Sequence, residues 1–234
     1  MTNMKRLERT IVTCTLCPRL VEHRQAVAIK KRRMFLNCEY WGKPIPPFGD
    51  PKAQVFILGL APAAHGGNRT GRVFTGDLSG TWVYRTLHKF GFASSPESIH
   101  RDDGLVLHGA FISAAVRCAP PLNKPSREEI INCRPFLIKE LQLLDNIEII
   151  VALGKIAFDA YLAACRDMGV TLPVPKPTFG HNVTYTLANG RKLVGSYHPS
   201  QQNTQTGRLT RNMFEDVFAG VSRLLNRPRA RFSP

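Results

Sequence analysis

The chain has 234 residues, 43% of them apolar, which is enough to bury a sizeable core and excludes a disordered protein. Lysine and arginine number 32 against 17 acidic residues, and this formal net charge of +15 favours a polyanionic partner such as a nucleic-acid backbone. Because there is no run of about 18 apolar residues and no apolar stretch at the start, we expect no membrane segment, no signal peptide and a cytoplasmic location.

The first half of the chain predicts two helices, the first of them highly charged, and two buried strands, all joined by loops. Lysine and arginine are dense up to residue 33, and four prolines and two glycines crowd the stretch that follows. Short apolar runs rich in β-forming residues indicate the strands. The expected elements are, in order, a helix over 5–33, a loop over 37–51, a strand over 54–60, a glycine-rich loop over 61–77, a helix over 79–90, a strand over 108–116 and turns over 117–125.

The second half predicts alternating helices and strands. Ser126 and Glu129 match a capping box, in which a hydroxyl and a carboxylate satisfy free amides at a helix start. Asn189 and Gly190 are a strong hairpin-turn signal. The expected elements are, in order, a helix from 126 to about 144, a strand over 147–153, a helix to about 166, an irregular stretch over 171–181, hairpin strands over 183–187 and 192–197, a helix over 210–225 and a loose basic tail over 227–234.

The recurring order of strand, loop and helix indicates an α/β protein with a mostly parallel sheet. The sequence shows no internal repeat and no linker, so we expect a single domain. In such sheets ligands bind beyond the carboxyl ends of the strands. The polar loops that follow Leu60, Val116 and Tyr197 all lie there, which makes them candidates for the functional site.

Four of the six cysteines are candidate metal ligands. Cys14 and Cys17 form a C-x-x-C pair, and Cys118 and Cys133 are the other two candidates. Four thiolates suit either zinc or an iron–sulfur cluster. Cys133 also lies on the apolar face of its predicted helix, so a small core residue is the alternative there. We expect the remaining two cysteines, Cys38 and Cys165, to be structural.

Four residues in the strand-end loops are candidates for chemistry, and each also has a purely structural interpretation. Phe74 either anchors its loop to the core or offers a platform on which a flat ring stacks. Asp77 either caps the next helix, which the residue alone favours, or holds a water and faces a developing positive charge. A lone histidine is more often structural than catalytic, but His198 precedes a proline at a strand end, where it can donate to the oxygen of a leaving group. Asn123 is a turn residue by its surroundings.

Four motifs in these loops together resemble the uracil-DNA glycosylase superfamily, and within it the family 5 (B-type) enzymes. They are residues 59–63 (GLAPA), 71–77 (GRVFTGD), 116–123 (VRCAPPLN) and 198–200 (HPS). With the cysteines they run from residue 14 to residue 200, and their order and spacing carry the resemblance. It implies a three-layer α/β/α fold with a central, mostly parallel four-stranded sheet, forming one glycosylase domain over residues 1–234.

The resemblance also implies a role for individual residues. A structural 4Fe–4S cluster would staple the basic N-terminal segment to the core through four ligands: Cys14, Cys17, Cys118 and Cys133. Phe74 falls on the position that stacks on the extruded base, and His198 falls on the histidine that binds and stabilises the departing base. Asp77 and Asn123 fall on the polar residues around the attacking water. The other substrate-binding positions are small residues: Gly59, Ala61 and Ala114.

Two departures from related families bear on specificity. Leu60, Ala61 and Ala63 stand where other families keep an acidic or amide side chain that activates water, which is itself typical of family 5. Ala114 stands where family 4 relatives carry an asparagine that recognises the edge of uracil. Because a small apolar residue leaves no polar group unpaired when a purine enters, we expect release of hypoxanthine and other damaged bases besides uracil.

We therefore expect a monomeric DNA glycosylase that acts on single- and double-stranded DNA carrying deaminated bases. Basic residues of the N-terminal segment, together with Arg208, are candidates for phosphate contacts. Three alternatives stay open: a narrow uracil-only glycosylase similar to family 4, a non-catalytic iron–sulfur DNA-binding module, and a zinc protein built on the same cysteines.

Overall fold

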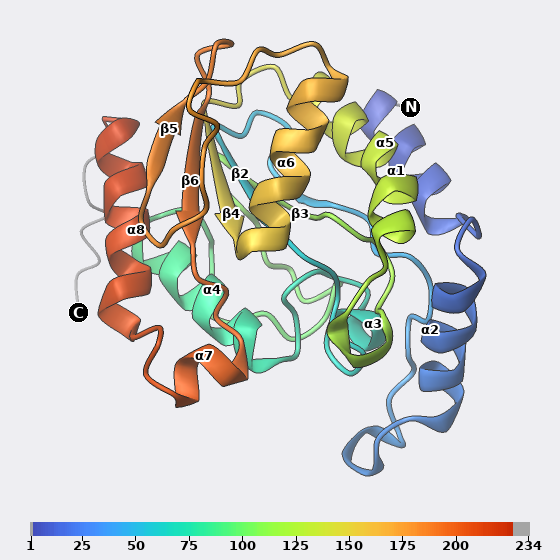
Figure 1. The fold of residues 1–234 in the computed structure, drawn as a ribbon. Helices are drawn as coiled ribbons and strands as arrows, with labels where there is room; N and C mark the ends of the chain where they lie inside the picture. Colours follow the sequence, from blue (N-terminus) through green and yellow to red (C-terminus); the bar gives the residue numbers. More distant parts are fainter. Residues whose placement is uncertain (1, 227–234) are drawn as a thin grey trace.

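The centre of the protein is a six-stranded sheet with the order β1-β3-β2-β4-β6-β5, seen in a computed structural model that describes residues 2–226 (Figure 1). The strands are β1 (Phe48–Gly49), β2 (Val55–Gly59), β3 (Ala110–Ala114), β4 (Ile149–Leu153), β5 (Thr184–Thr186) and β6 (Lys192–Ser196). The four central strands are parallel, and both edge strands run antiparallel to them. The expected mostly parallel four-stranded sheet is confirmed, with one short antiparallel strand added at each edge.

Alternating side chains of the central strands fill two separate cores, one on each face of the sheet. In β2, Val55 and Ile57 belong to one core, whereas Phe56 and Leu58 belong to the other. Each of these side chains is fully buried. Parallel strands covered on both faces carry continuous apolar runs, which is why the sequence indicated them clearly.

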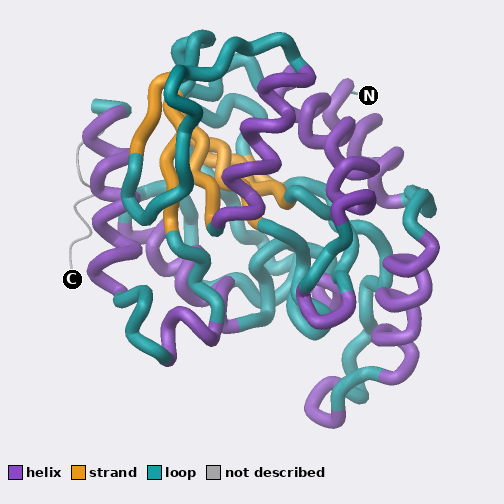
Figure 2. The backbone as a smooth tube through the Cα atoms, in the orientation of Figure 1, coloured by secondary structure: helices purple, strands orange, loops and turns teal. Residues whose placement is uncertain are grey.

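Helices cover both faces of the sheet and complete the expected three layers (Figure 2). On one face α4 packs against α8, and on the other α5 packs against both α1 and α6. The helices are α1 (Asn3–Val12), α2 (Pro18–Lys30), α3 (Gly67–Thr70), α4 (Leu78–Lys89), α5 (Arg127–Leu143), α6 (Lys155–Asp167), α7 (Gln201–Gln205) and α8 (Arg211–Leu224), with short 3-10 turns η1 (Arg33–Phe35) and η2 (Pro121–Asn123). The capping box at the start of α5 is present as predicted.

The N-terminal segment contains two helices where the sequence predicted one over 5–33. α1 ends at Val12, and α2 begins at Pro18 with Cys17 as its N-cap residue. Proline fits the first turn of a helix, because its missing N–H would have no partner there. The single predicted helix was therefore wrong, and both cysteines of the C-x-x-C pair lie in the break between the two helices.

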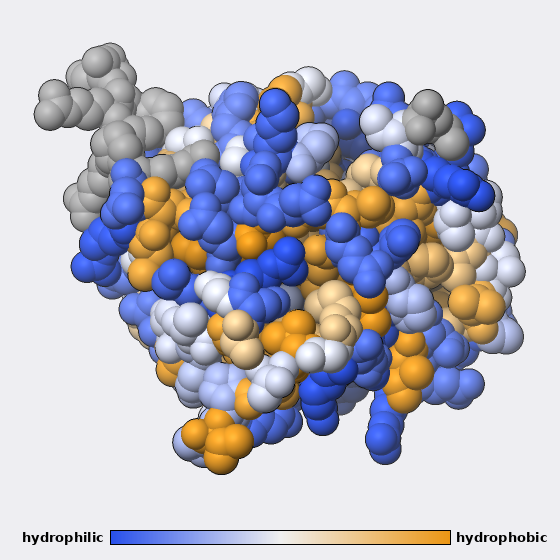
Figure 3. All heavy atoms as spheres, turned by 90° about the horizontal axis from the view of Figure 1, so that it is seen from above, coloured by the Kyte–Doolittle hydropathy of each residue, from blue (hydrophilic) through white to orange (hydrophobic). Residues whose placement is uncertain are grey.

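The two ends of the sheet differ in character. Figure 3 views the end at which the parallel strands begin, where hydrophilic side chains cover much of the surface between smaller apolar areas. The motif loops lie at the opposite end, in the lower part of Figure 1.

None of the described helices is long and apolar enough to cross a membrane. The basic tail expected over 227–234 lies outside the described residues.

Candidate active site

A cavity of about 370 Å³ lies at the carboxyl ends of the parallel strands. The loops that follow β2, β3 and β6 meet there, and the first turn of α4 closes one side. The structure brings together five of the residues proposed from the sequence, all of which line this cavity: Ala61, Phe74, Asp77, Asn123 and His198. An aromatic ring, a carboxylate, an amide and an imidazole therefore share one cavity.

Asp77 both caps α4 and faces the cavity, so the two interpretations of this residue are compatible. Its side chain accepts a hydrogen bond from Gly80 N at 2.8 Å. Burial raises the pKa of this carboxyl, while hydrogen bonds from the backbone of Gly80 and Ser79 and the charge of Arg69 act in the opposite direction. The effect of burial prevails, which gives a carboxylate in a partly dehydrated site, where electrostatic interactions are strong.

Glycine at position 66 makes room for the carboxylate. A Cβ atom on Gly66 would lie 2.2 Å from Oδ2 of Asp77, far inside van der Waals contact. Nothing in the local pattern distinguishes Gly66 from the other glycines of this loop, because the Asp77 side chain folds back over it from a position 11 residues later.

Phe74 lies with its ring against the end of the sheet and beside the cavity. It is 6% exposed, and its ring centroid is 5.8 Å from that of His198 at an interplanar angle of 39°. Its backbone has φ +53°, a conformation that non-glycine residues rarely adopt. A Cβ on Gly59 would lie 2.7 Å from the Phe74 ring, so glycine is needed there for the ring to pack.

Gly59 and Ala114 therefore support the site from behind. They are paired at the ends of β2 and β3, and both are buried. Neither is among the residues that line the cavity, although both were proposed as substrate-binding positions.

His198 enters the cavity from the turn after β6. Its backbone carbonyl accepts a hydrogen bond from Asn203 Nδ2 at 2.9 Å, which fixes that turn. Burial lowers the pKa of His198 to about 4, so its imidazole is neutral near pH 7. A neutral imidazole carries one N–H donor and one acceptor nitrogen, and it can donate a hydrogen bond without first binding a proton.

Asn123 also lines the cavity and lies in a strained turn. Leu122 and Asn123 have φ values of +54° and +57°, and Leu122 is 87% exposed. Asparagine tolerates this left-handed conformation better than most residues do.

The cavity also contains residues that sequence reasoning did not propose as site residues: Leu60, Ala63, Leu78, Ser79, Ser200 and Gln201. Leu60 and Ala63 follow β2 in the motif loop that was expected there, whereas the other four lie at the starts of α4 and α7, whose approach to the cavity local patterns do not indicate.

Comparison with known proteins identifies the family of this site. A sequence model of the uracil DNA glycosylase superfamily matches residues 46–221. The chain belongs to the uracil-DNA glycosylase superfamily. Members of this superfamily are glycosylases, so the protein is a hydrolase, and the resemblance found from the motifs is confirmed.

Several relatives are named type-5 uracil-DNA glycosylases. The chain is 49% identical to that of Thermus thermophilus over 92% of its own length and 95% of the relative. It is 48% identical to that of Mycobacterium tuberculosis, covering 93% and 80%, and 43% identical to that of Pyrobaculum aerophilum, covering 88% and 87%. A type-4 relative from Pyrobaculum aerophilum is 32% identical over 57% of this chain. The similarity thus places the chain with the type-5 glycosylases.

The four candidate cysteine ligands of this glycosylase lie in one region. Cys17 packs against a small cluster that contains Cys118 and Cys133. Burial raises the pKa of the Cys118 thiol, Arg24 lowers it, and Cys14 and Cys17 raise it slightly by their charge. In the described part of the chain, no group of three or more His, Cys, Asp or Glu side chains is arranged to hold a metal ion.

Two arginines counted among the positive charges of the N-terminal segment have partners within the glycosylase, one in the interior and one at the surface. Arg24 is 4% exposed, and its Nη1 donates to Cys118 Sγ at 2.9 Å. Arg19 pairs with Glu129 at 2.6 Å. Arg24 is therefore not available at the surface for a phosphate contact, whereas Arg19 keeps an exposed side chain. Arg208 is exposed and stacks on Tyr197, 4.8 Å from its ring centroid.

Proposed function

We propose that the protein hydrolyses the N-glycosidic bond between uracil and deoxyribose in DNA, in single and double strands, as the first step of base excision repair. One observation supports this most strongly: Phe74, Asp77 and His198 line the same cavity. The test is incubation with a duplex that contains a G·U pair. Free uracil and an alkali-labile site are the expected products, and an intact glycosidic bond would contradict the proposal.

The substrate nucleotide must leave the duplex to enter the cavity, because its glycosidic bond is inaccessible within the stack. Extrusion costs a few kcal/mol, and less at a mismatch such as G·U. The excess of positive charge supports binding of the phosphate backbone, which positions the protein without recognising sequence. The ring of Phe74 then supplies a flat apolar face for the extruded base.

His198 acts on the departing base. Cleavage leaves the base with a negative charge, and a neutral imidazole can donate its N–H to the base oxygen that carries this charge. The low pKa of His198, about 4, keeps the ring neutral over the physiological range. His198 therefore stabilises the leaving group by hydrogen bonding and does not transfer a proton as an imidazolium.

Asp77 acts on the sugar and the water. Glycosidic cleavage passes through a transition state with oxocarbenium character, and a nearby carboxylate stabilises this positive charge. The same carboxylate orients the attacking water, with the amide of Asn123, which lines the same cavity, as a second polar contact. Leu60, Ala61 and Ala63 offer no group that could replace Asp77.

We extend the proposal to hypoxanthine and other damaged bases, because the cavity wall after β2 is apolar. Ala61 and Ala63 line it and provide no side-chain hydrogen bond to the edge of a base. A site without such contacts cannot reject a purine by leaving its own polar groups unpaired. We expect hypoxanthine to be released from a duplex that releases no adenine at the same position. Failure to release any damaged purine would favour the uracil-only alternative.

A 4Fe–4S cluster held by Cys14, Cys17, Cys118 and Cys133 is the second part of the proposal. Two features of the chain support it: three of the four cysteines pack in one small cluster, and the buried Arg24 donates both to Cys118 Sγ and to the backbone carbonyl of the fourth, Cys14. Nε of Arg24 is buried without a protein partner. When bound, the cluster would staple the N-terminal helices to the core and take no part in hydrolysis.

Replacement of Cys118 tests the cluster. We expect the purified protein to contain iron and acid-labile sulfide, and Cys118→Ser to lose both, because serine is a poor ligand for iron in such clusters. Cys38→Ser is the matched control and should keep both. Zinc in place of iron in the wild-type protein would support the zinc alternative, and equal iron in the two variants would contradict the ligand assignment.

A further inference from the structure

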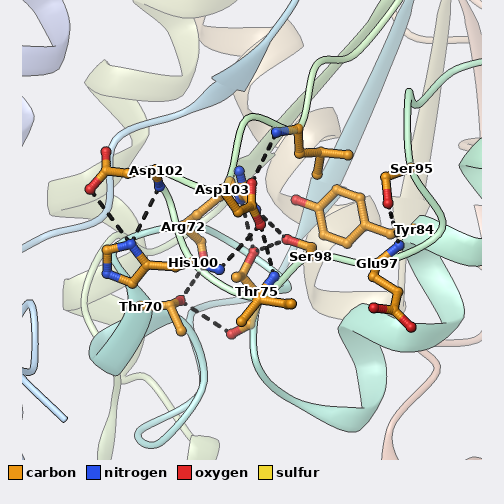
Figure 4. Close-up of polar contacts among 12 residues, drawn as sticks. Thr70, Arg72, Thr75, Tyr84, Ser95, Glu97, Ser98, His100, Asp102 and Asp103 are labelled. Carbon is orange, nitrogen blue, oxygen red and sulfur yellow. Dashed lines mark hydrogen bonds and ion pairs between the residues drawn. The ribbon is translucent and has the colours of Figure 1, made fainter.

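The glycine-rich loop of the site contains a buried arginine. Arg72 is 2% exposed, and it carries its charge into the interior between the loop and a neighbouring segment (Figure 4). Its Nε donates to Thr75 Oγ1 at 3.1 Å, and its Nη2 donates to Ser98 Oγ at 2.7 Å. The same nitrogen forms an ion pair with Asp103. A buried charge requires such partners, since leaving it unpaired is strongly destabilising.

This network holds the chain on both sides of Phe74. On one side, Thr75 Oγ1 shares a hydrogen bond of 2.6 Å with Ser98 Oγ. On the other side, the hydroxyl of Tyr84 donates to the carbonyl of Val73 at 3.0 Å. Phe74 itself has positive φ, a conformation that persists only where the surroundings impose it. The hydrogen bonds of its two neighbours impose it here.

Asp103 is itself fixed in position. Its carboxylate accepts hydrogen bonds from three backbone N–H groups, those of Ile99, His100 and Leu105. Burial raises the pKa of Asp103, but the hydrogen bonds from Arg72 and these amides outweigh that effect and hold it well below the usual range. The carboxylate is therefore ionised at every pH at which the protein works, and it offers Arg72 a rigid partner.

We infer that the Arg72–Asp103 pair is a positioning device that sets the ring of Phe74 and the carboxylate of Asp77 for reaction. The inference rests on the proposed function. Arg72 lies two residues before Phe74, and its partner Thr75 lies directly after it. Asp77 follows Thr75 by two residues. The ion pair therefore fixes the segment that carries both side chains of the site. Misplacement of reacting groups by about 1 Å can cost about 100-fold in rate, although the substrate still binds.

Single-turnover release of uracil tests the inference in Arg72→Met and Asp103→Asn. We expect each to release uracil at least about 10-fold more slowly, with the affinity for lesion-containing DNA changed much less. Leu162→Ala, a fully buried position in α6 on the other face of the sheet, is the control for lost stability. Urea unfolding identifies how far each variant is destabilised, and the control should keep the wild-type rate while folded.

A double-substitution cycle supplies the second measurement. If Arg72 acts through Phe74, the loss caused by Arg72→Met shrinks in a Phe74→Ala background. Wild-type rates in folded Arg72→Met and Asp103→Asn, losses that multiply in full, or an equal loss in Leu162→Ala would overturn the inference. If Arg72→Met does not fold, Asp103→Asn decides alone. If the wild-type protein releases no uracil, the proposed function fails and not this inference.

Discussion

Replacement of Asp77 by asparagine is expected to slow uracil release by about 100- to 1000-fold, the usual loss when one electrostatic contact to a transition state is removed. Asparagine has nearly the same shape, and its oxygen can still accept the hydrogen bond from Gly80 N that caps α4. The fold should therefore survive, so that the loss reports the missing charge. Single-turnover kinetics with excess enzyme measure the chemical step directly.

The matched control is Asp145→Asn, an exposed acid at the opposite end of the molecule. It should leave the rate unchanged. The pH dependence adds a second readout: burial raises the pKa of Asp77, and the ionised form is required, so the rate should fall as the pH falls through that pKa. Asp77→Asn should lack this acidic limb. Release at the wild-type rate by Asp77→Asn would exclude the carboxylate from the reaction.

Replacement of His198 by alanine is the second large effect, again about 100- to 1000-fold, because the negative charge of the leaving base loses its side-chain donor. His198→Gln keeps an N–H donor and should recover part of the rate. Since the pKa of His198 is about 4, the wild-type rate should show no titration near the ordinary histidine pKa of about 6.5. A rate that falls as the pH rises through that value would instead indicate a protonated histidine.

The sequence predicted those features whose cause is local. Apolar runs indicated the central strands, and the hydroxyl and carboxylate of Ser126 and Glu129 predicted the start of α5. The carboxyl ends of parallel strands meet at one edge of a sheet. This rule alone predicts that the motif loops form one site. Phe74 and Asp77 followed from that rule together with the family motifs.

The features that escaped prediction depend on contacts between distant segments. The close approach of Asp77 to Gly66 and that of Phe74 to Gly59 arise from how the loop folds over itself. Arg24 belongs to a charged helix whose pattern suggests solvent exposure, yet it turns inward to a cysteine 94 residues away. The role of Arg72 is similar, since its partners Ser98 and Asp103 come from the segment after α4 and no local pattern connects that segment with the loop.

The proposed reaction depends on a single cavity in which an aromatic ring, a carboxylate and a neutral imidazole act on one extruded nucleotide. The most direct test measures DNA affinity and single-turnover uracil release on the same preparations of wild type, Asp77→Asn and His198→Ala. We predict similar affinities for lesion-containing DNA and fast release by the wild type alone. Tight binding by the wild type without release, or equal release by all three proteins, would contradict the account.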